Sequence, residues 1–144
     1  MNNIDNIILT IKHCWYCYAP ATSSNELKNS FLYEFPLDYL RFIEGLGEGS
    51  IEFEEFMFST WNFDYLLEMN RSYEIEKYLN GLVAIGTDGG SICFLLDFRM
   101  KGETRFCSVS LGDLEVDEVK ILASSFTEGL ERMLQGKIKL EDII

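Results

Sequence analysis

The feature that most constrains this fold is a pair of apolar runs, LVAIG at 82–86 and ICFLL at 92–96, joined by a glycine-rich link. Asp88 and Gly89 lie in that link. Asp-Gly is a strong hairpin signal, because a type I′ turn needs positive φ at both central residues. We therefore predict two antiparallel strands, the second largely buried, with Asp88 and Gly89 as structural residues of the turn. The link does not match a phosphate-binding loop, since it lacks the lysine and a strand follows where a helix should begin.

Two other segments alternate between apolar and polar residues, as half-buried strands do. Residues 104–111 predict one strand. Residues 50–58 alternate and then break at Glu54 and Glu55, so we interpret them as a strand with a bulge, lying at an exposed edge of the sheet. Such an edge could pair with a second copy of the chain, whereas its glutamates would discourage pairing. A monomer and a homodimer both stay open.

Helical periodicity is strongest over residues 119–134, where apolar residues recur at i, i+3, i+4 and i+7. Acidic residues precede this segment, and we interpret them as stabilising the dipole of the helix. Pro36 is expected at the first position of a shorter helix, where its missing N–H has no intrahelical partner to lose. Residues 61–79 have a helical composition, in one or two pieces, and residues 3–13 fit either a helix or a strand.

The length of 144 residues suits a single domain spanning 1–144. Helices toward both ends and strands between them indicate the α+β class, with a central antiparallel or mixed sheet flanked by helices. The formal net charge of −12, from 24 acidic and 12 basic residues, argues against nucleic acid or an anionic membrane as a partner. The N-terminal segment lacks the basic start of a secretory signal, and the apolar runs are too short for a membrane span, so we expect a cytoplasmic location.

Four cysteines raise the question of metal or redox chemistry. Cys14 and Cys17 have C-x-x-C spacing, and with Cys93 and Cys107 they could complete a zinc tetrahedron. The sequence has no second C-x-x-C and no thioredoxin-like βαβ pattern, so we favour packing as small apolar side chains, while a redox or metal role for Cys14 and Cys17 stays open. The single histidine, His13, cannot form a histidine metal cluster. We predict no catalytic residue, no metal and no cofactor.

Residues 42–70 contain seven acidic residues and no basic one, between Arg41 and Arg71. The segment is also rich in aromatic residues, among which Trp61 could be an anchor if it is exposed. Acids interleaved with aromatics could form a surface that attracts a basic protein, or a solvated face over an aromatic core. For the first alternative, the predicted partner-binding residues are Glu44, Glu48, Glu52, Glu54, Glu55, Trp61, Asp64 and Glu68.

The order of these segments resembles the SUKH superfamily, which includes the yeast cell-wall-assembly regulator, bacterial Syd and many bacterial immunity proteins. FPLDY at 35–39 is similar to the superfamily's LP-x-D/E-Y, with Phe35 in place of the usual leucine. LVAIGTDGGSICFLLD resembles its strand–turn–strand ending in an aspartate, here Asp97, and ILASSFTEGLERML resembles its final helix. The resemblance covers residues 22–134. GLGEG replaces the usual Asn-Gly after the second helix, and CWYC has no counterpart.

The resemblance implies an α+β domain and, for many bacterial members, an immunity protein that binds a cognate toxin without catalysis. An acidic inhibitor would suit a basic toxin, such as a nuclease whose active site attracts phosphate. Two alternatives stay open: a general intracellular protein-interaction or regulatory domain, and a small-molecule-binding domain or enzyme of unknown class. We expect Asp97 to be structural, holding a neighbouring backbone group or an arginine.

Overall fold

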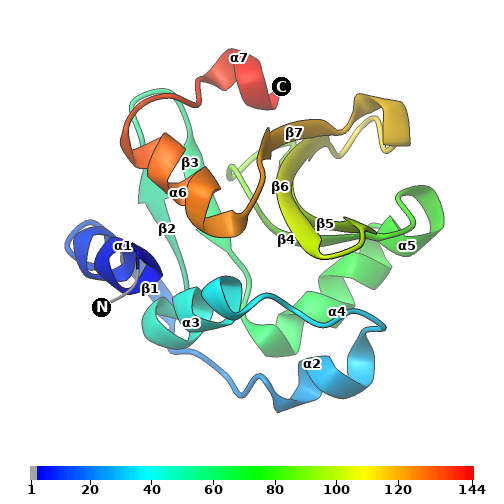
Figure 1. Ribbon diagram of the computed structural model, residues 1–144, viewed down its shortest axis with the longest axis horizontal. Coiled ribbons are helices and arrows are strands. Elements are labelled where there is room, and N and C mark those ends of the chain that lie inside the picture. Colours follow the sequence, from blue (N-terminus) through cyan, green and yellow to red (C-terminus); the bar gives the residue numbers. More distant parts are fainter. Residues whose placement is uncertain (1–2) are drawn as a thin grey trace.

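The computed structural model describes residues 3–144, apart from the side chains of residues 26, 28 and 29. Within this part, seven strands form one antiparallel sheet in the order β1 to β7, so that each strand pairs with its neighbours in sequence (Figure 1). The strands are β1 (Tyr16–Ala19), β2 (Glu48–Glu52), β3 (Met57–Thr60), β4 (Leu82–Thr87), β5 (Ile92–Met100), β6 (Glu103–Ser110) and β7 (Lys120–Ala123). The helices are α1 (Asn3–Lys12), α2 (Asn25–Ser30), α3 (Leu37–Leu46), α4 (Phe63–Ser72), α5 (Ile75–Tyr78), α6 (Phe126–Leu134) and α7 (Leu140–Ile143), with a 3-10 turn η1 at Val116–Glu118. The α+β class, with an antiparallel sheet flanked by helices, is confirmed.

The larger core fills one face of the sheet, beneath α1, α3 and α6 (Figure 1). Phe58, Phe94 and Phe106 project from β3, β5 and β6 toward Phe126 of α6, and each is at most 1% exposed. The ring centroids of Phe58 and Phe94 are 5.1 Å apart, and those of Phe106 and Phe126 are 5.8 Å apart. Burying each such ring contributes about 2–3 kcal/mol to folding. This aromatic cluster therefore holds strands β3, β5 and β6 together beneath α6.

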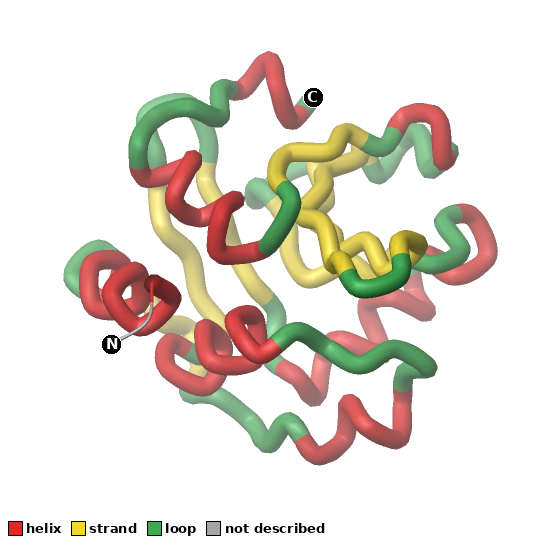
Figure 2. The backbone as a smooth tube through the Cα atoms, viewed as in Figure 1, coloured by secondary structure: helices red, strands yellow, loops and turns green. Residues whose placement is uncertain are grey.

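A second core covers the opposite face, but only over β4–β6, where the strands curl strongly (Figure 2). Side chains from these strands alternate with those of the first core and pack under Ile75 of α5 and under Leu79, which follows that helix. Asn70 of α4 ties this cover to the sheet, because its side-chain amide donates to the Ala84 carbonyl and accepts from the Ala84 N–H, both at 2.8 Å. The strand residues of this core are Leu82, Ala84, Cys93, Leu95, Cys107 and Val109.

Residues 50–58 form a hairpin, so the prediction of one bulged strand at the edge of the sheet is wrong. β2 and β3 are antiparallel neighbours, with Glu52 opposite Met57, and the chain turns at Glu54 and Glu55. Both strands are interior, since β1 and β7 form the edges of the sheet. A period of two looks the same before and after a tight turn, which explains why the pattern did not reveal the reversal.

Residues 119–134 do not form one helix, and that prediction is also wrong. Residues 120–123 are strand β7, and α6 begins at Phe126. Ser125 is the N-cap of α6, and its hydroxyl accepts a hydrogen bond from Glu128 N at 3.1 Å. A serine at this point offers the backbone a local partner and starts a new helix. The acidic residues assigned to the helix dipole lie instead in the loop and 3-10 turn before β7.

The link between β4 and β5 is a hairpin turn, as predicted, but it is not type I′. Gly89 has a φ of 84°, whereas Asp88 does not take positive φ. Instead, the Asp88 carboxylate accepts hydrogen bonds from Gly90 N at 2.9 Å and Ile92 N at 3.1 Å. The turn is therefore longer than two residues, and the aspartate holds it with its side chain.

Pro36 lies one position earlier than predicted. It is the N-cap of α3, with φ −67° and ψ 146°, and its carbonyl accepts from Leu40 N at 3.2 Å. Residues 61–79 form two helices, α4 and α5, separated near Glu74, whose φ is 55°. The N-terminal segment, for which strand and helix were open, is helix α1.

Candidate functional site

The structure spreads the seven acids of segment 42–70 over several elements. They lie on α3, on β2, in the β2–β3 turn and on α4, in this order: Glu44; Glu48 and Glu52; Glu54 and Glu55; Asp64 and Glu68. Glu48 is half-buried and the others are exposed. The β2–β3 hairpin places Glu48 at one end and the two turn glutamates at the other, so neighbours in sequence are separated in space.

One carboxylate pair does come together, at the beginning of β2. The pKa of Glu48 is raised, first by partial burial and then by repulsion from Asp64. The loop after β1 fixes this arrangement. Asn62 donates to the Pro20 carbonyl at 2.9 Å, and the Thr22 hydroxyl donates to Asp64 at 3.3 Å. Two carboxylates within electrostatic range of each other favour a nearby cation.

The turn glutamates have a different setting. The Glu55 carboxylate accepts a hydrogen bond from Leu140 N at 2.8 Å, at the beginning of α7. A carboxylate there also suits the positive end of the helix. Glu55 therefore helps to hold the C-terminal segment against the hairpin.

Trp61 is not the exposed anchor that the sequence allowed. Its side chain is half-buried and packs against both cores. Its ring stacks on Tyr73, with centroids 6.4 Å apart and an angle of 19° between the planes. The main role of Trp61 in the structure is packing.

The uncovered face of β1–β3 brings together residues that the sequence did not single out. A shallow depression of about 540 Å³ is lined by six residues that we call the open face: Cys14, Tyr16, Tyr18, Ser50, Glu52 and Met57. Tyr16 and Tyr18 are 68% and 56% exposed, with ring centroids 5.2 Å apart. The hydroxyl oxygens of Tyr18 and Ser50 are 2.8 Å apart in a hydrogen bond, which lays the Tyr18 ring across the buried Ser50.

Trp15 decides which side of β1 faces outward. Its indole N–H donates to the Leu46 carbonyl at 2.9 Å, and its ring meets Phe42 edge-on at 5.5 Å. Because side chains alternate along a strand, Tyr16 then points away from the larger core. The register shifts at Tyr18, a bulge of the kind found at sheet edges and near functional sites. The aromatic run WYCY is a strand signal that could have revealed β1.

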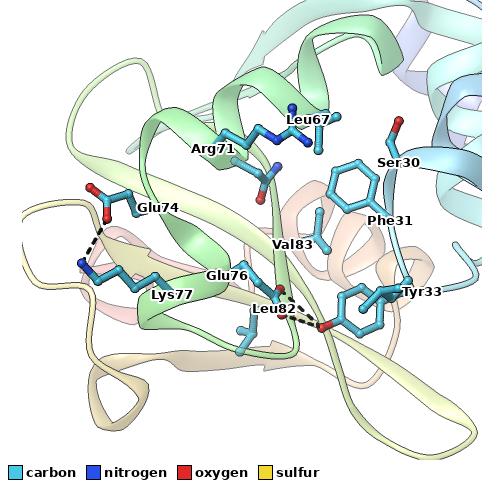
Figure 3. A pocket seen from close by; sticks show the side chains of 12 residues that line it. Ser30, Phe31, Tyr33, Leu67, Arg71, Glu74, Glu76, Lys77, Leu82 and Val83 are labelled. Carbon is cyan, nitrogen blue, oxygen red and sulfur yellow. Dashed lines mark hydrogen bonds and ion pairs between the residues drawn. The ribbon is translucent and has the colours of Figure 1, made fainter.

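A second hollow, of about 400 Å³, lies between residues 30–33 and helices α4 and α5 (Figure 3). Its apolar walls are formed by Phe31, Leu67, Leu82 and Val83. Four of its polar residues form two pairs: the Tyr33 hydroxyl donates to Glu76 at 3.4 Å, and Lys77 forms an ion pair with Glu74 at 3.4 Å. The side-chain amide of Asn70, which also lines the hollow, is hydrogen-bonded to the backbone of Leu66 and Ala84.

Asp97 has partners of both kinds that the sequence suggested, an arginine and a backbone group. Its carboxylate is fully buried and accepts from Arg99 Nε at 2.9 Å, from Arg105 Nη2 at 2.7 Å and from Arg99 N at 2.9 Å. Burial alone would raise the pKa of Asp97, but the hydrogen bonds from Arg99 and Arg105 outweigh it and hold the pKa below its usual range. The ionised Asp97 therefore fastens the end of β5 to β6.

Asp38, in the FPLDY segment, joins two helices that are far apart in sequence. One carboxylate oxygen accepts from Thr127 N at 2.9 Å and from the Thr127 hydroxyl at 2.7 Å. Thr127 lies in the first turn of α6, where unpaired backbone N–H groups and the helix dipole favour a carboxylate. The next residue, Tyr39, is fully buried and packs edge-on against Phe126. The segment thus locks α3 against α6.

A model of the SMI1 / KNR4 family (SUKH-1) matches residues 21–132. The chain belongs to this family. The match confirms the SUKH resemblance, and the matched residues include Asp38 and Asp97 with their hydrogen-bond partners. No curated protein matches the chain.

The SMI1/KNR4 match leaves out β1 (Tyr16–Ala19). The open face is therefore a composite. Ser50, Glu52 and Met57 come from the family's sheet, while Tyr16 and Tyr18 come from a strand that precedes the matched residues.

The cysteines of this SMI1/KNR4 member divide into two pairs. Cys93 and Cys107 are buried in the second core, which confirms packing, but Cys14 and Cys17 are exposed, so packing is wrong for them. Burial raises the pKa of the Cys93 and Cys107 thiols to about 12 in each case. Within residues 3–144, no group of three or more potential ligands is placed to hold a metal ion. None of the helices in this part is long and apolar enough to span a bilayer.

Proposed function

We propose that this chain is a non-enzymatic immunity-type protein that binds a cognate basic toxin in the cytoplasm and neutralises it. The observation that carries the proposal is the charge: −12 overall, with seven acids and no base in segment 42–70, on a SMI1/KNR4 fold. A strongly acidic surface attracts a basic partner, speeds association and disfavours acidic competitors.

Neutralisation of this kind needs contact and no chemistry by the inhibitor. A nuclease must present cationic groups to bind phosphate. Carboxylates of the inhibitor can pair with those groups and exclude the substrate. Exposed candidates for such contacts are Glu44, Glu52, Glu54, Asp64 and Glu68. Glu48, Glu55 and Trp61 complete the set expected from the sequence: Glu48 and Trp61 are half-buried, and the exposed Glu55 carboxylate accepts the hydrogen bond from Leu140 N.

The test is co-expression with the product of the neighbouring reading frame. If that product is the cognate toxin, cells that make it alone should stop growing, and cells that also make this chain should grow. The purified pair should co-elute at low salt and separate as the salt concentration rises, because screening weakens electrostatic attraction. A frame whose product is toxic but is neither bound nor neutralised contradicts the proposal.

The hollow beside Tyr33 favours one alternative function, the binding of a small apolar ligand. Its volume of about 400 Å³ lies within the range of ligand sites, and its walls are mainly apolar. A thermal-shift screen with small apolar and amphipathic compounds tests this alternative. Stabilisation that is abolished by Leu67→Trp, which puts a larger side chain at a half-buried position of the wall, would favour it over protein binding. A general interaction domain is the other alternative, and a housekeeping gene neighbourhood would favour it.

A further inference from the structure

We propose that the open face, with Glu48 beside it, is the docking surface for a basic protein, and that Tyr16 and Tyr18 are its anchors. The identity of the partner as a toxin rests on the proposed function. The position of the surface and the charge of its occupant rest on the geometry alone.

The tyrosines have the properties of interface anchors. Tyr16 and Tyr18 are more than half exposed, although most aromatic rings of this chain are packed in the cores. They lie on a strand of the sheet, and the hydrogen bond between Tyr18 and Ser50 holds one ring in place. A rigid tyrosine offers a large contact area at a small entropic loss on binding, and tyrosine is enriched among residues that dominate binding energy.

The charges around the tyrosines select the partner. Glu52 is the one charged residue among the six that line the open face, and no lysine or arginine is among them. Glu48 lies four positions before Glu52 on β2, so its side chain points to the same side of the sheet as that of Glu52. Asp64 is within electrostatic range of Glu48. Carboxylates therefore stand at two places along β2, beside aromatic rings on which an arginine can stack.

A second copy of the same chain is a poor occupant. Each copy carries a net charge of −12, and a face-to-face pair would bring Glu48 and Glu52 of one copy toward the same carboxylates of the other. Like charges in an interface oppose association. A basic protein surface with lysines or arginines complements this face, and we commit to that occupant.

The origin of the tyrosines fits a surface that recognises one particular partner. β1 lies outside the residues that match the SMI1/KNR4 family, while the sheet beneath it lies inside them. The sheet within the matched residues thus supplies a platform, and a short strand outside them supplies the anchors. Proteins that share one fold commonly carry different binding sites on it.

The test uses short random peptides displayed on phage and selected on the immobilised full chain, so it needs no knowledge of the natural partner. Peptides that bind are sequenced, and their affinities are measured for two matched double variants. One is Tyr16→Ala/Glu52→Lys on the open face, and the other, the control variant, is Tyr78→Ala/Glu115→Lys, with one position on α5 and one in the loop before η1. Both pairs of positions are exposed, and both variants change the same residue types and the same net charge. Thermal unfolding monitored by circular dichroism establishes that both variants fold.

We expect the selected peptides to be rich in lysine and arginine. The open-face variant should bind them about 30-fold or more weaker, and the control variant should bind within about threefold of the wild type. Peptides without a basic bias, equal losses in the two variants, or an unaffected open-face variant would each overturn the proposal. A basic bias and an open-face loss, combined with failed protection in the co-expression experiment, would retain the docking surface and reject the toxin as its occupant.

Discussion

One side of the sheet has two contrasting halves. A single row of paired residues crosses it from β1 to β6, in the order Tyr16, Ser50, Ser59, Thr87, Cys93 and Val109. The row begins at Tyr16, which is 68% exposed, and ends at Val109, which is 1% exposed. The first half is aromatic and hydroxylic and open to solvent, whereas the second half is apolar and lies under α5.

The two halves therefore differ in how much they contribute to the stability of the fold. The covered half is closed by α5 and by residues 111–119, which fold back over β4–β6. Within the part of the chain that the structure describes, the first half is open to solvent at the depression lined by Tyr16 and Tyr18. An antiparallel sheet tolerates water on one face. We therefore assign the covered half to the scaffold and the open face to binding.

The largest expected effect separates the two halves by stability. Leu95→Ala, in the fully buried centre of the second core, should lower the free energy of unfolding by about 3–4 kcal/mol, because it leaves a cavity. Tyr16→Ala, on the open face, should change it by less than about 0.5 kcal/mol. Urea denaturation of both variants measures the contrast. Similar losses in the two variants would show that the open face is structural.

A smaller loss is expected at the end of the covered half. Asp97→Asn removes the charge that holds Arg99 and Arg105, whose side chains are 30% and 24% exposed. Because these arginines reach solvent, the loss should be about 2–3 kcal/mol at neutral pH, below that of a wholly buried pair.

The same variant has a pH signature. The pKa of Asp97 is lowered in the folded state, so its contribution to stability is present above the pKa of an unfolded aspartate, about 4, and is lost as the pH falls through the lower folded value. The difference between wild type and Asp97→Asn should be constant from about pH 7 to pH 5 and shrink below about pH 4. Urea unfolding at several pH values checks this, and a difference that does not depend on pH would contradict the ionised pair.

The hydrogen bonds between Asn70 of α4 and the backbone of Ala84 on β4 can be removed without changing an apolar core residue. Asn70→Ala leaves the backbone N–H and carbonyl of Ala84 without their side-chain partners, which should cost about 2 kcal/mol. Amide hydrogen exchange should speed up at Ala84 and in α4, and remain unchanged in β1 and β2. Equal acceleration in β1 would mean that the two halves open together.

The smallest effect concerns the thiols and should leave stability unchanged. In the native protein a thiol reagent should modify Cys14 and Cys17, which are exposed, and leave Cys93 and Cys107 intact, because burial raises the pKa of each of these two thiols to about 12. Unfolding in urea should make all four reactive. Native modification of the buried pair would show that the second core is not closed.

The sequence predicted the features whose signals are local. Asp88 and Gly89 mark a hairpin through the chemistry of one turn, and Asp97 at the end of an apolar run was expected to hold an arginine or a backbone group, which the structure shows it does. The order of motifs also identified the family correctly. Segments 50–58 and 119–134 were misassigned because a turn and a cap interrupt patterns that otherwise look continuous.

The candidate site was harder to predict, because its composition depends on long-range pairing. β1 has four residues and pairs with β2 about thirty positions later, so the side that Tyr16 faces is not encoded near Tyr16. The acidic segment shows the opposite problem. Its members are close in sequence, yet the hairpin sends Glu48 and Glu54 to opposite ends. Proximity in sequence therefore suggested one continuous acidic surface that the fold divides, and it gave no sign of the open face.

The central claim, that the open face is the binding surface, can be tested most directly through Cys14, which lines it. In a Cys17→Ser variant, the rate of thiol modification at Cys14 is measured alone and with a saturating basic peptide from the selection. We expect the bound peptide to slow the reaction at least about tenfold, because a docked chain covers the depression. An unchanged rate at Cys14, while the peptide is shown to be bound, would mean that the peptide binds elsewhere on the molecule.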